Sequence, residues 1–135
     1  MEEFVTFELA KKLKEKGFDI PCMDAINKFG CSYRNGWCEY LDDRDDEFIT
    51  LKDLNENDYL LPTISQVLKW LRETHNIHIN IGFFRHNGNT ELYWVFSIEN
   101  IKEDVEYDWL YSTSHDSYEE AALAGIEWVL DNILI

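Results

Sequence analysis

The sequence has few basic residues for its length. Its 135 residues include 12 Lys and Arg against 27 Asp and Glu, which gives a formal net charge of −15. Proteins that bind a nucleic-acid backbone displace condensed counterions with clustered cations, and docking on an anionic membrane also needs basic residues. The composition therefore argues against direct binding to nucleic acid and against attachment to a membrane surface.

Long apolar runs and an export signal are also missing. The start, Met1-Glu2-Glu3, has no basic n-region or apolar h-region, and no run approaches the roughly 20 apolar residues that span a bilayer. The three cysteines are an odd number, which favours free thiols in a reducing compartment. We therefore expect a cytoplasmic protein.

No catalytic signature is recognisable. Ser114, His115 and Asp116 are adjacent, and adjacent residues cannot chain hydroxyl, imidazole and carboxylate as a catalytic triad requires. The acidic run at residues 42–47 lacks the glycine of an EF-hand loop and is typical of a solvated loop. The sequence therefore predicts a non-enzymatic protein without a cofactor.

Three helices are predicted from capping residues and apolar spacing. The first covers residues 7–16, with Thr6 as its N-cap and Gly17 as its stop. The second begins at the Thr63–Gln66 capping box and ends at Asn76. A second capping box, Ser117 with Glu120, opens the last helix, and all three helices carry an apolar stripe.

Three strands are predicted between the second and third helices. Apolar residues alternate from Ile77 to Phe83, and Asn87-Gly88 is typical of a two-residue hairpin turn. A third strand is expected over residues 105–113. With that turn, the predicted cross-strand pairs on the apolar face are Phe83 with Leu92, Ile81 with Trp94, Ile79 with Phe96, and Ile77 with Ile98.

These elements predict one α+β domain over residues 1–135. Residues 63–135 form an antiparallel three-stranded meander flanked by two helices, in the order helix, strand, strand, strand, helix. Both helices should cover the face that carries Ile79 and Trp94. Residues 1–62 form a subregion of a helix and a β-hairpin that packs on this core.

The stretch CSYRNGWCEY at residues 31–40 is the most site-like motif. With Asn35-Gly36 as a two-residue turn, Cys31 and Cys38 become diagonal neighbours on one face of a hairpin. Diagonal residues lie about 7–8 Å apart, too far for an unstrained disulfide or for two ligands of one tetrahedral ion. A zinc site formed by Cys22, Cys31, Cys38 and a histidine remains the alternative.

The second face of the predicted meander mixes small, aromatic and polar groups. Its side chains include His78, Asn80 and Phe84 from one strand and Tyr93 and Val95 from the next. A patch with aromatic residues at its centre and polar residues at its rim suits a protein interface. The alternative is that the N-terminal half of the chain covers this face.

Three stretches of the chain resemble a known group of proteins. They are FVTFELAKKLKEKGFDIPC at residues 4–22, LPTISQVLKWLRETHNIHINI at residues 61–81 and SYEEAALAGIEWVLDNIL at residues 117–134. In this order they are similar to segments of small uncharacterised proteins from phage, prophage and related mobile DNA of gut bacteria. The resemblance implies a mobile-element setting and carries no catalytic residues, because no activity is assigned to that group.

The leading functional expectation is an acidic module that binds another protein, such as a factor of the bacterial host. One alternative is an acidic mimic of nucleic acid that occupies a host nucleic-acid-binding protein, for which a net charge of −15 is suitable. The other alternative is the small cysteine and histidine metalloprotein. A homodimer formed through the sheet face or edge is a further expectation.

Overall fold

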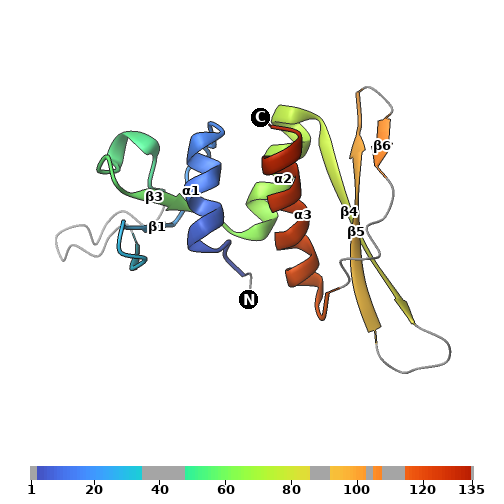
Figure 1. Ribbon diagram of the computed structural model, residues 1–135. Helices are drawn as coiled ribbons and strands as arrows, with labels where there is room; N and C mark the ends of the chain where they lie inside the picture. Colours follow the sequence, from blue (N-terminus) through green and yellow to red (C-terminus); the bar gives the residue numbers. More distant parts are fainter. Residues whose placement is uncertain (1–2, 35–47, 86–91, 103–104, 108–114, 135) are drawn as a thin grey trace. The chain divides into compact units, whose positions relative to one another are not determined.

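The computed structural model describes residues 3–34, 48–85, 92–102, 105–107 and 115–134. The chain is an α+β protein with three α-helices and antiparallel sheets among these residues (Figure 1). It divides into two compact units, Met1–Gln66 (unit 1) and Val67–Ile135 (unit 2), and each is described by itself. The division lies close to the predicted boundary between the subregions 1–62 and 63–135. The prediction that both units form a single domain stays a prediction.

Unit 1 begins with helix α1, Phe7–Glu15. The Thr6 hydroxyl accepts a hydrogen bond from the Leu9 N–H at 3.2 Å, so the predicted N-cap is confirmed. Gly17 follows the helix with φ of 87°, a conformation that glycine adopts without steric cost. Local sequence therefore determines both ends of α1.

A short three-stranded antiparallel sheet follows in unit 1. Its strands are β1 (Asp24–Ile26), β2 (Ser32–Arg34) and β3 (Tyr59–Leu61), in the order β2-β1-β3. The Asn27 side chain shapes the turn between β1 and β2, because its Oδ1 accepts from the N–H groups of Phe29 and Cys31 at 2.9 and 3.0 Å. Sequence analysis did not find β1 or β3. The predicted hairpin turn at Asn35-Gly36, Cys38 and the acidic run at 42–47 lie outside the described residues.

Helix α1 packs on β3, and one lysine connects α1 with the chain that leads into this strand. Lys14 Nζ donates to the backbone carbonyls of Glu56 and Asp58 at 2.7 and 3.0 Å. It also lies 5.0 Å from the centroid of the Tyr59 ring. A 3-10 turn, η1 (Leu51–Asp53), precedes this segment. Helix and sheet of unit 1 are thus held together by polar as well as apolar contacts.

Helix α2, Ile64–His75, begins in the way the sequence predicts. The Thr63 N–H donates to Gln66 Oε1 at 2.8 Å, and the Gln66 N–H donates to Thr63 Oγ1 at 3.2 Å. The capping box is therefore confirmed in both directions. Asn76, in the left-handed region with φ of 58°, ends the helix and connects it to the next strand.

Helix α3, Tyr118–Asn132, is capped by Ser117, whose Oγ accepts from the Glu120 N–H at 3.1 Å. The return bond of the predicted capping box differs by one residue, because Glu120 Oε2 accepts from the N–H of Asp116 rather than that of Ser117. Either donor satisfies the start of the helix, so the helix begins where the sequence predicts.

The strands of unit 2 are β4 (Ile77–Arg85), β5 (Leu92–Asn100) and β6 (Val105–Tyr107), in the order β4-β5-β6. The antiparallel meander is confirmed over the described residues, and the remainder of the predicted third strand lies outside them. Both α2 and α3 lie on one side of the β4–β5 ladder in Figure 1, and α3 packs against both strands.

The predicted register of the β4–β5 ladder is wrong by two residues. Phe83 pairs with Trp94, Ile81 with Phe96 and Ile79 with Ile98. A shift of two residues keeps every side chain on the same face, so apolar alternation cannot distinguish the two registers. The prediction depended on a turn at Asn87-Gly88, which lies outside the described residues. No helix of the described chain is long and apolar enough to cross a bilayer.

Candidate functional site

The β4–β5 ladder has two faces of different character. The first face meets α3 and carries Ile77, Ile79, Phe96 and Ile98, all of them buried. Gly125 of α3 makes this contact close, because a Cβ on Gly125 would lie 2.9 Å from Ile79 Cγ2 and 3.3 Å from the Phe96 ring. The predicted core face is therefore confirmed for α3, and a glycine on the helix permits the approach.

The second face carries all five residues of the interaction surface that the sequence predicts. The observed register places Phe84 opposite Tyr93, Gly82 opposite Val95 and Asn80 opposite Ser97. Side chains at directly opposite positions are the closest cross-strand neighbours, so Phe84 and Tyr93 form one unit. Their rings stack with centroids 5.5 Å apart and an interplanar angle of 29°.

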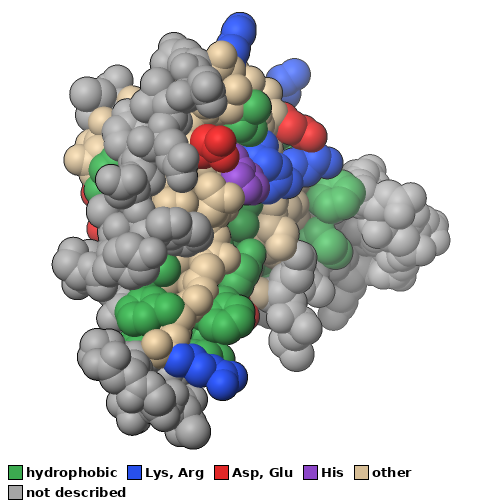
Figure 2. Space-filling model, turned by 90° about the vertical axis from the view of Figure 1, so that its right-hand side faces the viewer, with side chains coloured by type: hydrophobic (Ala, Val, Ile, Leu, Met, Phe, Trp, Pro, Cys, Tyr) green, Lys and Arg blue, Asp and Glu red, His purple; other side chains and the backbone are tan. Residues whose placement is uncertain are grey.

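Burial divides this second face into two parts. His78, Asn80, Phe84 and Tyr93 are half-buried, whereas Val95 and Ser97 have exposed fractions of only 3% and 1%. Figure 2 shows hydrophobic side chains spaced along the side of the molecule that lies to the right in Figure 1. The accessible part of the second face therefore consists of the Phe84–Tyr93 pair and the polar His78 and Asn80.

The cysteines that the sequence offers as metal ligands have unlike environments. Cys22 is buried, and its Sγ donates to the Ile20 carbonyl at 3.2 Å. Burial, with a smaller effect of the Asp24 charge, raises the pKa of this thiol to about 12, so the thiolate that zinc binds is disfavoured. Cys31 is exposed and free, and Cys38 lies outside the described residues. Within the part of the chain that the structure describes, no three His, Cys, Asp or Glu side chains gather around a common point.

The described histidines lie in different parts of unit 2 and have different surroundings. His75, at the end of α2, meets the Trp70 ring edge-on at 4.6 Å between centroids, and burial lowers its pKa. His78 lies on the second face of the ladder. His115 stacks on Phe96 with centroids 6.3 Å apart. Ser114 of the rejected triad lies outside the described residues.

Unit 1 contains one short polar contact that sequence reasoning missed. The Tyr33 hydroxyl donates to Asp58 Oδ2 at 2.6 Å. Burial, followed by this hydrogen bond and the Asp58 charge, raises the pKa of Tyr33 to about 12. The phenol therefore stays protonated at neutral pH and joins β2 to the turn before β3. This is a structural contact without a reactive group.

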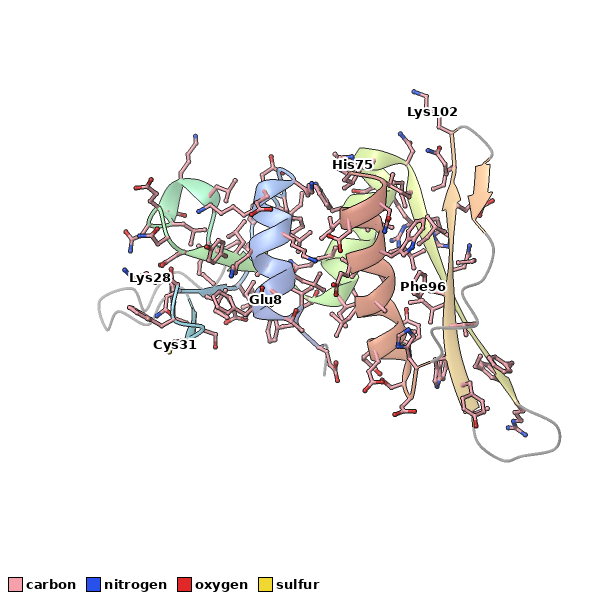
Figure 3. All side chains as sticks on the ribbon, in the orientation of Figure 1. Glu8, Lys28, Cys31, His75, Phe96 and Lys102 are labelled. Carbon is pink, nitrogen blue, oxygen red and sulfur yellow. The ribbon has the colours of Figure 1, made fainter. Side chains whose placement is uncertain are left out.

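A cavity of about 260 Å³ opens beside α3 in unit 2. Phe96 and His115 line it from the sheet side, and α3 contributes the stripe that includes Ala124, Glu127 and Trp128. Phe96, labelled in Figure 3, lies between β5 and α3. The sequence did not indicate this cavity, because the bridge between Trp94 and His115 brings together residues that are distant along the chain.

Comparison with protein-family models, with curated proteins and with solved structures finds no match to this chain. The resemblance to small proteins of phage and mobile DNA is not tested by these comparisons. It stays a prediction that rests on the three stretches quoted above.

Proposed function

We propose that this chain is a non-enzymatic, cytoplasmic module that binds another protein through the second face of the β4–β5 ladder. The observation that carries the proposal is the stacked Phe84–Tyr93 pair, which is half-buried on the face opposite α3. Two adjacent aromatic rings offer a large apolar contact area with few rotatable bonds. Such residues are enriched at the energetic centre of protein interfaces.

The polar surroundings of this pair support a protein partner. His78 and Asn80 lie on the same face and supply hydrogen-bonding groups at the rim, as in interfaces whose centre is aromatic. The net charge of −15 favours a partner with a basic surface, because opposite charges steer the encounter. We further propose a bacterial host protein as this partner, as the resemblance to mobile-element proteins implies.

The chain offers a matched pair of phenylalanines for the test. Phe83 and Phe84 are neighbours in β4, but their side chains lie on opposite faces, and Phe83 is 59% exposed. Partners are captured from bacterial lysate with the wild-type chain, identified by mass spectrometry, purified and titrated by calorimetry. The double variant Phe84→Ala with Tyr93→Ala should weaken binding about tenfold or more, because it removes the aromatic centre.

Phe83→Ala serves as the control and should change the dissociation constant less than about threefold, because the Phe83 side chain lies on the opposite face, away from the proposed binding surface. Circular dichroism and thermal unfolding confirm that each variant is folded at the titration temperature. Equal weakening by both changes, or full affinity of the double variant, would exclude the second face as the binding surface.

The second candidate function is the acidic mimic of nucleic acid, which the net charge of −15 favours. The same purified partner decides between the two. Binding that persists near 1 M salt supports the aromatic interface, because the Debye length falls to about 3 Å at that ionic strength. Binding that is lost at high salt, competes with DNA and is unaffected by loss of Phe84 and Tyr93 supports mimicry.

A further inference from the structure

Strand β4 lies at the edge of its sheet. The strand order β4-β5-β6 leaves β4 paired with β5, and no other described strand pairs with it. β4 has nine residues, whereas natural edge strands are often kept short, because their unpaired backbone groups can pair with another chain. The outer edge of β4, the side away from β5, is therefore a long template for one more strand.

The hydrogen bonds of β5 show which residues of β4 face this outer edge. The N–H and C=O of Trp94 bond to the backbone of His115 at 2.9 and 2.7 Å, so both groups point away from β4. In an antiparallel ladder, opposite residues either bond to each other or both point outward, and the two kinds of pair alternate. Phe83, which lies opposite Trp94, therefore directs its N–H and C=O to the outer edge.

A bond at the start of the ladder gives the same alternation. The Ile101 N–H donates to the Asn76 carbonyl at 2.8 Å, so the even-numbered position before β4 bonds across to the β5 side. Even-numbered residues of β4 thus direct their backbone groups to β5, and odd-numbered residues direct theirs outward. The outward set consists of Ile77, Ile79, Ile81, Phe83 and Arg85.

β4 lacks the features that usually protect an edge strand. Its sequence, IHINIGFFR, contains no proline and no acidic residue, and Arg85 at its end is its only Lys or Arg. Its nine residues pair with β5 without a bulge. Phe83 is 59% exposed on the first face, whereas Ile77 and Ile79 on the same face are buried. Edges that must remain single usually carry charges, prolines or bulges, so this edge favours pairing.

We propose that the outer edge of β4 pairs antiparallel with β4 of a second copy of this chain. A two-fold axis at Ile81 places Ile81 opposite its own copy and Ile79 opposite Phe83 of the second copy. This register pairs all nine residues, and every outward N–H and C=O gains a partner. It also gives the exposed Phe83 ring an apolar cross-strand neighbour. The contact is self-complementary, as the interface of a two-fold dimer must be.

The charge distribution favours a second copy at this edge. The chain has a net charge of −15, yet β4 contributes none of its acidic residues, so two copies can meet here without placing carboxylates opposite each other. The expectation of a homodimer is thereby narrowed to one edge and one register. Pairing at an edge leaves both faces of the ladder accessible, so the inference goes beyond the proposed second-face interface and does not depend on it.

Sedimentation equilibrium of the whole chain tests for the dimer. We expect a dissociation constant of about 10–100 µM, because two paired strands bury less surface than a permanent dimer does. Raising the salt concentration from about 50 mM to about 500 mM should tighten the dimer severalfold, since screening weakens the repulsion between two acidic chains. A chain that stays monomeric at millimolar concentration would overturn the proposal.

Amide hydrogen exchange, followed by nuclear magnetic resonance, locates the interface. The N–H groups of Ile81 and Phe83 should exchange severalfold more slowly at a concentration that saturates the dimer than in the dilute monomer. The Gly82 N–H points to β5 and should change little, so it serves as the internal control. A dimer that protects neither Ile81 nor Phe83 would contradict the proposed edge.

Two variants at one position separate the backbone from the side chain. Phe83→Pro removes an outward N–H and should weaken the dimer about tenfold or more, whereas Phe83→Ala keeps this N–H and should weaken it about threefold. The proline variant should remain folded, because the lost N–H does not bond to β5, and thermal unfolding checks this. Equal dissociation constants for the two variants would show that the backbone edge is unpaired in the dimer.

The same amide signals distinguish a strand of another protein from a second copy. If the chain stays monomeric while a purified partner protects Ile81 and Phe83, the edge belongs to a strand of that partner and the homodimer is excluded. Phe84→Ala with Tyr93→Ala should leave the dimer dissociation constant unchanged, because both rings lie on the second face. The edge dimer and the second-face interface can therefore fail separately.

Discussion

The two faces of the β4–β5 ladder differ in composition and in burial, although the same two strands form both. The first face packs against α3 and is apolar along the length that α3 covers. The second face mixes small, aromatic and polar groups, and only Val95 and Ser97 of its described side chains are buried. Exposure also rises along β4, from 2% at Ile77 to 59% at Phe83. The α3 helix therefore accounts for burial on the first face, whereas the burial of Val95 and Ser97 on the second face does not come from α3.

The largest expected effect comes from a comparison of two single variants, each of which removes one phenylalanine from one face. Phe96→Ala should lower the free energy of unfolding by about 3–4 kcal/mol, because Phe96 is 2% exposed and contacts the α3 helix. Phe84→Ala should lower it by about 1 kcal/mol, since a half-buried ring loses less burial. Urea denaturation of both variants measures the two losses. Losses of equal size would show that the second face is packed as tightly as the first.

A glycine on each face gives the second test. Gly125→Ala should lower the free energy of unfolding by about 1–2 kcal/mol, because the new Cβ would lie 2.9 Å from Ile79 Cγ2 and overpack the contact. This loss outweighs the gain in helix propensity of at most about 1 kcal/mol.

The matched control is Gly82→Ala in β4 on the second face, which should leave stability unchanged or raise it by about 0.5 kcal/mol, because alanine is less costly than glycine within a strand. Both variants are measured by urea denaturation against the same wild-type chain. A stabilising Gly125→Ala would contradict the close packing of α3 on the ladder.

The smallest expected effect belongs to Ser97, which is buried on the second face. Its Oγ has no hydrogen-bond partner among the described residues. Ser97→Ala should leave the free energy of unfolding unchanged or raise it by up to about 1 kcal/mol, because an unpaired buried hydroxyl is costly. Thr63→Ala, which deletes a confirmed cap, should instead cost about 1 kcal/mol. A comparable loss for Ser97→Ala would show that the hydroxyl has a partner.

Helix ends were the most predictable part of the fold. Thr6, Ser117 and the Thr63–Gln66 pair make the capping bonds that their residue types indicate. These bonds form between residues three positions apart, so they depend little on the remainder of the chain. The face on which each residue of β4 and β5 lies was predictable for the same reason, because strand alternation is local.

Unit 1 shows where this local information ends. Strands β1 and β3 have three residues each, too short for alternation to be recognised. β1 forms because β2 and β3 both pair with it, and the partners in β3 are distant along the chain. The buried state of Cys22 and the Tyr33–Asp58 hydrogen bond also arise from such pairing. None of these features has a signal in a short window of sequence.

The candidate sites also differ in how far the sequence could predict them. The sequence alone predicted the members of the second-face surface, because residues two apart in a strand share a face. It did not predict that Val95 would be buried or that Phe84 would stack on Tyr93, since the register differs by two positions from the one expected. It did not indicate the cavity of Phe96, His115 and Trp128 at all.

By itself, the sequence determined where the helices begin, which strand residues share a face, and the strong negative charge of the chain. These properties depend on residue type and on spacings of two to four positions. Only the tertiary structure decided the ladder register, the covered face, and the meeting of His115 with Phe96 beside the carboxylates of α3. Those properties depend on contacts between residues far apart in the chain. The free energies of such contacts cannot be predicted from a short window of sequence.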